Sequence, residues 1–344
     1  MEALHRHAPN AHDISFVGSS DGFERPIIQE SGVTLNHFHE VSAGPLNGVG
    51  VVRAVGSVAK IVWGISQATR ILIKRKPQAI LLTGGWANVP VALAAAILRI
   101  PMLVYLPDIE PGKTIQYLAR IASKVALTVA DSTRYFPNIL TVVTGYPLRQ
   151  TVMNATREAG QAHFKLDAKR PIVLFFGGSR GARSINQSLE ANLPQLLELA
   201  QVIHVTGTLD WERSQSATSS HSDYHAYSYL HEDMGLAMAA ADIVVCRSGA
   251  STLGELPYFG LPSVLVPYPH AWQYQKTNAD YLVSRGAAVR LDDDQLSQEL
   301  LPTLRTLLQD KVQLEAMKQS ALQAAGGSAD ALAQELLALA GERA

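Results

Sequence analysis

The 344-residue sequence is poor in cysteine, in charged residues and in long apolar runs. Its one cysteine, Cys246, excludes a disulfide framework and a metal site made of cysteines alone, and is typical of a reducing compartment. Charged residues make up only 17% of the chain and the formal net charge is −1, which argues against binding to nucleic acid.

Long apolar runs are also missing. The most apolar stretch, 89–107, is interrupted by Arg99 and by prolines, so it is too short to cross a bilayer. Residues 1–10 have no apolar core of the kind found in a signal peptide. We therefore expect a cytoplasmic protein, either soluble or bound peripherally to the inner face of the plasma membrane.

Acidic residues are unevenly distributed. Residues 1–150 hold 14 Lys and Arg against 9 Asp and Glu, whereas the remainder holds 15 against 21. No acidic residue occurs between Glu40 and Asp108, where seven basic ones are found. Most of them belong to an apolar and basic segment at about 50–75, which is either an ordinary amphipathic surface helix or a contact with an anionic membrane surface.

Short apolar, β-rich runs alternate with helical patterns along the whole chain. The expected strands are 14–17, 79–83, 102–106, 125–129, 140–144, 172–176, 202–206, 225–229, 242–246, 263–266 and 287–291. Strands that alternate with helices predict parallel sheets covered on both faces, and hence an α/β protein with two doubly wound domains. A Gly- and Pro-containing break places the domains at 1–147 and 148–327. The helix expected at 328–344 packs either on the first domain or as a cap on the second.

Two strand-to-helix turns in the second half carry the strongest chemical signal. In FFGGSRGAR, residues 175–183, glycines follow a strand and open a helix whose N-terminus favours a phosphate. Its spacing is not that of the dinucleotide fingerprint. In RSGASTLGE, residues 247–255, Ser251 or Thr252 suits a helix cap, and Glu255 either accepts from a ribose diol or complements the helix dipole.

The first half offers a weaker signal. Gly84 and Gly85 end an expected strand, and Asn88 is a candidate cap for the next helix. Asp108 and Glu110 follow another strand, where they are either solvated loop acids or carboxylates that face a cleft.

These motifs, in this order, resemble the MurG family of glycosyltransferase family 28, the bacterial N-acetylglucosaminyltransferases of peptidoglycan synthesis. The resemblance rests on residues 175–183, 230–234 (LHEDM), 247–255, 266–270 (VPYPH) and 275–279 (QKTNA). The GGWANVP segment at 84–90 and VTGYPLR at 143–149 are similar to N-terminal motifs of the family.

The resemblance implies a GT-B fold, with two Rossmann-like domains and a cleft between them. It also implies an inverting transfer of N-acetylglucosamine from UDP-N-acetylglucosamine to a lipid-linked muramyl-pentapeptide, without a metal or other cofactor. The residues that it assigns to the donor are Arg149, Gly178, Ser179, Gly181, His231, Ser251, Glu255 and Gln275. Gly84, Gly85 and Asn88 would lie on the acceptor side, and the first domain would face the membrane.

The departures from the family pattern concern the acceptor side. The strand and GGTGGH loop with which the family begins are not present in these residues, and Asp108 stands where the family has an asparagine. Asp108 is therefore the candidate general base. A related transferase with another lipid acceptor, and a UDP-sugar-binding module without catalysis, remain alternatives.

Overall fold

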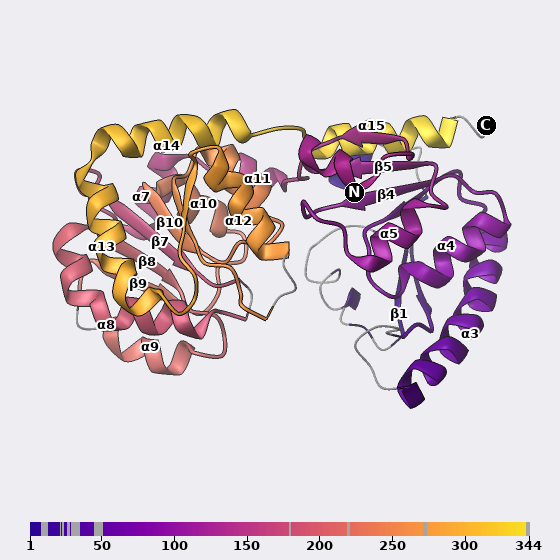
Figure 1. The fold of residues 1–344 in the computed structure, drawn as a ribbon, viewed down its shortest axis with the longest axis horizontal. Helices are drawn as coiled ribbons and strands as arrows, with labels where there is room; N and C mark the ends of the chain where they lie inside the picture. Colours follow the sequence, from indigo (N-terminus) through magenta and orange to yellow (C-terminus); the bar gives the residue numbers. More distant parts are fainter. Residues whose placement is uncertain are drawn as a thin grey trace. The chain divides into compact units, whose positions relative to one another are not determined.

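The computed structural model describes residues 1–7, 13–20, 22, 24–25, 28, 35–44, 51–178, 180–218, 221–270 and 274–341. The chain divides into two compact units (Figure 1). Unit 1 comprises Met1–Pro147 and Gly327–Ala344, and unit 2 comprises Leu148–Gly326.

Unit 1 is an α/β unit in which parallel strands form two separate sheets. Its elements are α1 (Glu2–His7), β1 (Ser15–Ser19), β2 (His37–Val41), α3 (Val51–Arg75), β3 (Ile80–Leu82), α4 (Asn88–Ile97), β4 (Met102–Leu106), α5 (Lys113–Ala119), β5 (Lys124–Leu127), the 3-10 helix η1 (Ala130–Tyr135), β6 (Thr141–Val143) and α15 (Ala329–Gly341). Strands β1 and β2 pair with each other, and the second sheet has the order β3-β4-β5-β6.

Helices cover both faces of the larger sheet in unit 1. On one face, side chains of α3 and α4 pack against β3, β4 and β5 in a core that also includes Val41 of β2. On the other face, Leu332 and Leu339 of α15 pack against Leu103 and Tyr105. An ion pair of 2.7 Å between Lys124 and Glu335 also connects the last helix to this unit. The helix expected at the end of the chain thus packs on unit 1.

Unit 2 is built around one parallel sheet. Its elements are α6 (Gln150–Met153), α7 (Arg157–Phe164), β7 (Ile172–Phe176), α8 (Arg183–Leu199), β8 (Gln201–Val205), α9 (Trp211–Thr218), β9 (Tyr224–Tyr227), α10 (Met234–Ala240), β10 (Ile243–Cys246), α11 (Thr252–Phe259), β11 (Ser263–Leu265), α12 (Tyr274–Ser284), β12 (Ala288–Arg290), α13 (Leu296–Gln309) and α14 (Lys311–Ala324).

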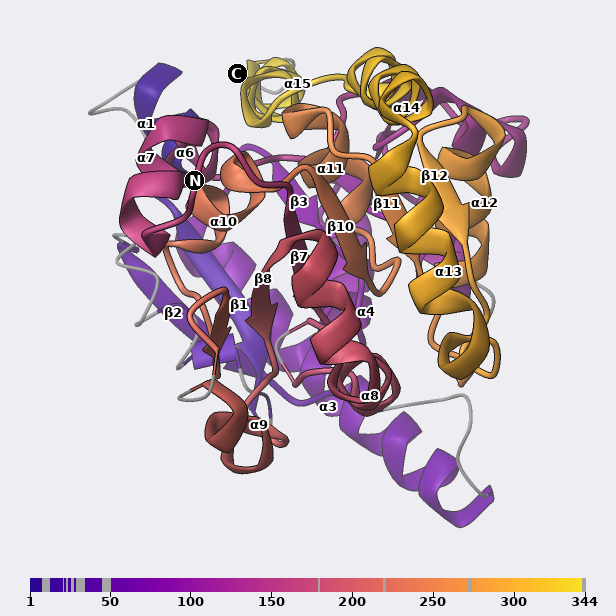
Figure 2. The same cartoon turned by 90° about the vertical axis from the view of Figure 1, so that its left-hand side faces the viewer.

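The two innermost strands of unit 2, β7 and β10, are entirely apolar because both faces of the sheet are buried. All five side chains of β7, Ile172–Phe176, are buried. Helices α8 and α13 lie side by side over one face, where Ile185, Leu189 and Leu300 are fully buried (Figure 2). The strand order is β12-β11-β10-β7-β8-β9, the doubly wound arrangement predicted from the sequence.

Some local expectations were wrong. Strand β2, with the sequence HFHEV, and helices α7 and α9 were not predicted. Asn88 is not a helix cap: the N-cap of α4 is Ala87, and the side chain of Asn88 donates to the carbonyl of Gly84. No helix of the described ranges combines the length and the apolar character that crossing a membrane would require.

Candidate functional site

The topology of unit 2 marks one edge of its sheet as the place for a ligand. The chain runs outward from β7 through β8 to β9, and then returns to the other side of β7 to form β10, β11 and β12. Loops that leave β7 and β10 therefore diverge at the carboxyl end of the sheet. In doubly wound folds, ligands bind in the crevice at this switch point.

The loop after β7 holds its backbone in conformations that favour glycine. Gly178 has a φ of 89° and Gly181 a φ of 80°, and the N–H of Gly181 donates to the carbonyl of Gly178 over 2.9 Å. A Cβ on Gly178 would meet no atom within 4 Å, so this part of the loop faces open space. Ser179 lies outside the described residues. Helix α8 then begins at Arg183, and its N-cap, Ala182, has no side chain that could satisfy the first N–H groups.

The loop after β10 brings three predicted residues together. Ser251 is the N-cap of α11, as expected, but its hydroxyl hydrogen-bonds the carboxylate of Glu255 instead of capping the helix. Burial raises the pKa of Glu255, whereas the hydrogen bond from Ser251 and the positive charge of Arg149 lower it. Arg149, which is the N-cap of α6, therefore lies close enough to act on this carboxylate. The result is a half-buried carboxylate at the start of a helix.

Arg247 was not singled out as a site residue, yet it crosslinks the loops at this edge. Its guanidinium forms an ion pair of 2.5 Å with Asp293 and donates to the hydroxyl of Ser184 over 2.8 Å. It also donates to the carbonyls of Val266 and Pro267. Only 11% of its side chain is exposed, so the guanidinium is bound by partners within the protein. Arg247 thereby holds the start of α8 and the loops after β10 and β11 in register.

Gln275 and His231 lie at the ends of other segments in unit 2. The side-chain oxygen of Gln275, on the first turn of α12, accepts a hydrogen bond of 2.8 Å from the N–H of Tyr268. This leaves the side-chain amide nitrogen as the group that can donate to a ligand. His231 is exposed and packs edge-to-face on Tyr229, with 4.5 Å between ring centroids.

The predicted residues of unit 1 follow β3 and β4. Gly84 and Gly85 both have positive φ, and Asn88 holds the turn through its bond to Gly84. Asp108 follows β4 in a half-buried position. The hydroxyl of Thr128 lies 2.9 Å from the hydroxyl of Tyr105 and donates to the carbonyl of Pro107, the residue before Asp108. The backbone that carries Asp108 is therefore fixed by buried hydrogen bonds.

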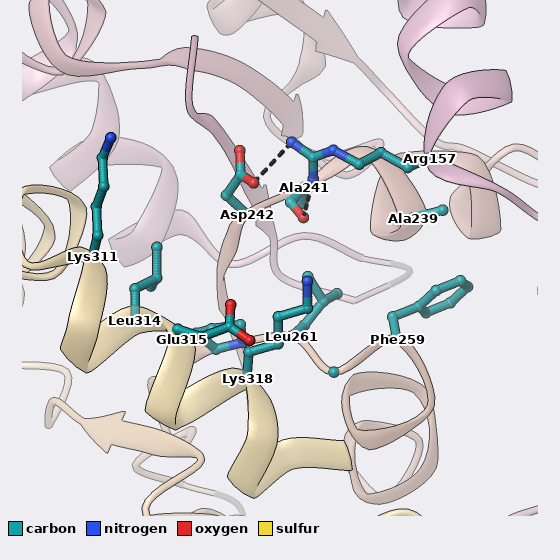
Figure 3. A pocket seen from close by; sticks show the side chains of 12 residues that line it. Arg157, Ala239, Ala241, Asp242, Phe259, Leu261, Lys311, Leu314, Glu315 and Lys318 are labelled. Atoms are coloured by element: carbon teal, nitrogen blue, oxygen red, sulfur yellow. Dashed lines mark hydrogen bonds and ion pairs between the residues drawn. The ribbon is translucent and has the colours of Figure 1, made fainter. Parts of the chain in front are cut away.

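A separate cavity of about 400 Å³ lies at the opposite edge of the unit 2 sheet (Figure 3). It is lined by Asp242 and Pro262, which precede β10 and β11, and by residues of α14 such as Lys311 and Lys318. Arg157 and Asp242, which both line it, form an ion pair of 2.8 Å. Because it lies at the amino ends of the strands, this cavity does not include the glycine loops. Within the described ranges, no group of three or more His, Cys, Asp or Glu side chains could hold a metal ion.

Comparison with known proteins identifies the family. Residues 1–127 match the Glycosyltransferase family 28 N-terminal domain, and residues 172–335 match the Glycosyltransferase family 28 C-terminal domain. The chain is 40% identical over 326 residues to the UDP-N-acetylglucosamine–N-acetylmuramyl-(pentapeptide) pyrophosphoryl-undecaprenol N-acetylglucosamine transferase of Roseiflexus sp. (strain RS-1), covering 82% of this chain and 72% of that protein. It is 35% identical over 331 residues to the transferase of the same name from Desulforudis audaxviator, covering 93% and 87%.

A solved structure agrees with these sequence relatives. The crystal structure of Acinetobacter baumannii MurG matches with a TM-score of 0.77 and 25% identity, over 98% of this chain and 94% of that one. The likeness confirms the predicted GT-B class, with its two Rossmann-like domains. From its two family domains, its relatives and its fold, the chain belongs to glycosyltransferase family 28, within the MurG family.

Proposed function

We propose that the protein transfers N-acetylglucosamine from UDP-N-acetylglucosamine to a lipid-linked muramyl-pentapeptide, with inversion at the anomeric carbon. The observation that carries this proposal is the switch point of unit 2, where two glycine-containing loops open helices α8 and α11. The relatives named above are transferases with this donor and this acceptor, and they cover most of the chain.

The donor binds at the carboxyl edge of the unit 2 sheet. The diphosphate lies against Gly178, Ser179 and Gly181, where backbone N–H groups and the dipole of α8 stabilise negative charge. Glu255 accepts hydrogen bonds from the ribose diol, and Ser251 holds the carboxylate in place. Gln275 donates to the sugar, and the backbone near His231 binds the uracil. Arg149 lies beside the donor because it acts on Glu255.

The chemical step changes bonds in both the acceptor and the donor. The acceptor hydroxyl must lose a proton while the bond from the anomeric carbon to the diphosphate breaks. Asp108 is the general base in this proposal, held on the loop after β4, and the turn of Gly84, Gly85 and Asn88 lies on the acceptor side. Replacing Asp108 with Asn should lower kcat by about 100-fold or more with little change in donor KM. Unchanged turnover would show that another group takes the proton.

The departing UDP is stabilised by fixed groups of the protein. Two helix N-termini and the guanidinium of Arg149 supply positive potential where negative charge develops on the diphosphate. We therefore propose that the transfer needs no metal or other cofactor.

The acceptor is reached through an anionic membrane surface, which α3 of unit 1 contacts at the cytoplasmic face. Exposed apolar side chains occur on this helix, including Val62, which is 62% exposed, and Trp63, which is 54% exposed. Arg70 stacks over Trp63, with its guanidinium carbon 5.9 Å from the ring centroid. Apolar side chains interspersed with Lys and Arg are typical of helices that lie in a membrane interface.

Vesicle sedimentation tests the membrane contact. Wild-type protein should bind vesicles of anionic lipid more strongly than zwitterionic ones, and added salt should weaken that binding. Val62→Asp should reduce the bound fraction. Val312→Asp on α14 is the matched control, because Val312 is 82% exposed but belongs to unit 2. Equal losses for both variants would contradict the proposed surface.

The central experiment measures UDP release from UDP-N-acetylglucosamine with and without the lipid-linked muramyl-pentapeptide. Release that depends on this acceptor supports the proposed function. Release with diacylglycerol but not with the muramyl acceptor would identify a different lipid substrate. Binding of UDP without release under any condition would indicate a UDP-sugar-binding module that is not catalytic.

A further inference from the structure

Arg183 occupies an electrostatically unfavourable position at the start of α8. It is the first residue of the helix, where the aligned peptide dipoles favour negative charge. Its side chain is 71% exposed, yet its Nε donates to the buried carboxylate of Asp210 over 3.2 Å. The guanidinium carries further N–H donors on its two Nη atoms, in a planar arrangement that matches phosphate oxygens. A cation kept beside a helix N-terminus suits a site where an anion binds.

Asp210 is held by hydrogen bonds that leave little room for movement. Its second carboxylate oxygen accepts from the side-chain amide of Asn186 over 3.0 Å. The same amide donates to the carbonyl of Thr206 over 2.8 Å. The oxygen of Asn186 lies 3.0 Å from Nε2 of His204, whose Nδ1 lies 2.7 Å from the hydroxyl of Tyr224. Asn186 and His204 are fully buried. This chain of bonds fixes the carboxylate to the body of the sheet.

The loop that carries Asp210 also packs directly on the glycine loop. A Cβ on Gly181 would lie 2.1 Å from the carbonyl oxygen of Thr206, and one on Gly207 would lie 2.3 Å from the Cα of Gly181. The two loops therefore approach as closely as backbone allows. The side chain of Arg183, which Asp210 on the loop after β8 anchors, thus lies beside the proposed phosphate loop after β7.

From this arrangement we propose that Arg183 binds the diphosphate of the nucleotide sugar through its Nη groups, and that Asp210 is the positioning residue that orients it. The inference rests on the proposed function, since it assigns a further residue to the same donor site. Asp210 accepts from Nε of the guanidinium, and the two Nη atoms supply the donors for the phosphate oxygens. The buried bonds to Asn186 and His204 keep the anchor in place as the donor arrives and UDP leaves.

Titration with UDP and with uridine separates a phosphate contact from a general effect on the fold. In Arg183→Ala, UDP should bind about 10-fold more weakly or worse, the loss of a charge-assisted hydrogen bond, whereas uridine affinity should stay within about 2-fold. Arg213→Ala is the matched control. Arg213 of α9 is 45% exposed and pairs over 2.8 Å with Glu190 of α8, the helix that begins with Arg183. The affinities of this control should equal those of the wild type.

Asp210→Asn tests the positioning role. The variant should lose affinity for UDP but not for uridine, and it should raise the KM for the donor more than it lowers kcat. In the Arg183→Ala background it should change UDP affinity no further, because the group that it orients is gone. If Asp210→Asn does not fold, Arg183→Lys replaces it: retained charge without the planar fork should give an intermediate UDP affinity.

Three outcomes would overturn the inference. They are wild-type UDP affinity in Arg183→Ala, equal losses for UDP and uridine in that variant, and a further loss from Asp210→Asn in the Arg183→Ala background. A wild-type protein that binds neither UDP nor uridine would instead contradict the proposed function itself. The two failures are therefore distinguishable in one set of titrations.

Discussion

Acidification is expected to destabilise unit 2 through one buried imidazole. His204 on β8 is fully buried between Tyr224 and Asn186, and burial lowers its pKa to about 3. The amide nitrogen of Asn186 donates to two acceptors, so its oxygen must be the atom that faces His204. Nε2 of His204 therefore carries the proton, and Nδ1 accepts from the hydroxyl of Tyr224. The native structure requires the neutral ring.

The size of the effect follows from the difference between the folded and unfolded pKa. An unfolded histidine titrates near 6.5, so between about pH 6.5 and 3 the unfolded chain binds a proton that the folded chain does not. The free energy of unfolding should thus fall as the pH is lowered through that window, by about 1.4 kcal/mol per pH unit at most. Between pH 7 and pH 5 the loss is about 2 kcal/mol.

Two other groups of unit 2 change the total in opposite directions. His225 also has a pKa lowered mainly by burial, which adds to the loss at low pH. Glu255 has a raised pKa, so the folded protein takes up this proton more readily than the unfolded chain does. Its protonation at low pH therefore raises the free energy of unfolding and opposes the loss from the histidines. The contribution of His204 must therefore be isolated by substitution.

Urea unfolding of the wild type and of His204→Gln at about pH 7 and about pH 5 makes that measurement. The variant should be less stable at pH 7, because it disturbs a buried hydrogen-bonded network. Its stability should also fall by about 2 kcal/mol less than that of the wild type between the two pH values. His221→Gln, at an exposed position, is the control and should follow the wild type. An equal fall in the wild type and in His204→Gln would refute the reasoning.

Four further predictions concern the candidate site. Gly181→Ala places a side chain at a φ of 80° with its Cβ 2.1 Å from the carbonyl of Thr206, so it should lower the free energy of unfolding by about 2 kcal/mol or more; chemical denaturation checks this, and Gly178→Ala, which meets only open space, should lose less. Glu255→Gln should raise the donor KM by about 10-fold or more by removing the proposed charged acceptor for the ribose, while its melting temperature stays at or above that of the wild type; steady-state kinetics and calorimetry measure the two. Arg247→Ala should lower the free energy of unfolding by about 3 kcal/mol, because it leaves Asp293 with a hydrogen bond from Ser184 but without its cationic partner. A loss below about 1 kcal/mol, the size of a surface pair, would contradict the buried crosslink. Excess chelator should leave the rate of transfer unchanged, and a rate restored only by added divalent ion would contradict metal-independent chemistry.

The fold could be predicted wherever burial leaves a continuous apolar run. Strands such as Ile172–Phe176 are recognisable because both faces of a parallel sheet are covered. Strand β2, with two histidines and a glutamate among its five residues, gives no such run and was missed. Helices α7 and α9 are short and mostly polar, so their apolar period is too weak to detect.

The candidate site could be predicted where its residues are local in sequence. Gly178, Gly181 and Ser251 stand in turns that directly follow strands, and Glu255 lies in the first turn of the helix after one of them. This position alone places them at one edge of the sheet. The pairs Arg183–Asp210 and Arg247–Asp293 join positions 27 and 46 residues apart, and no local pattern specifies such partners. Asn88 shows the opposite error, because a residue suited to capping instead bonds the turn before the helix.

These long-range pairs explain how loops at the edge of a sheet can hold a defined geometry. A glycine loop is entropically costly to order, and neither α8 nor α11 has its first turn capped by its own N-cap side chain. In unit 2 the order comes from outside the loops: Arg247 joins Ser184 to Asp293, and Asp210 joins Arg183 to the buried Asn186. The first N–H groups of α8 therefore have no side-chain cap and face the proposed ligand, whereas those of Thr252 and Leu253 in α11 donate to the carbonyls of Gly249 and Ala250. Side chains from neighbouring loops fix where the two helix starts lie. A site arranged in this way can stabilise a diphosphate without reorganising as charge develops on it.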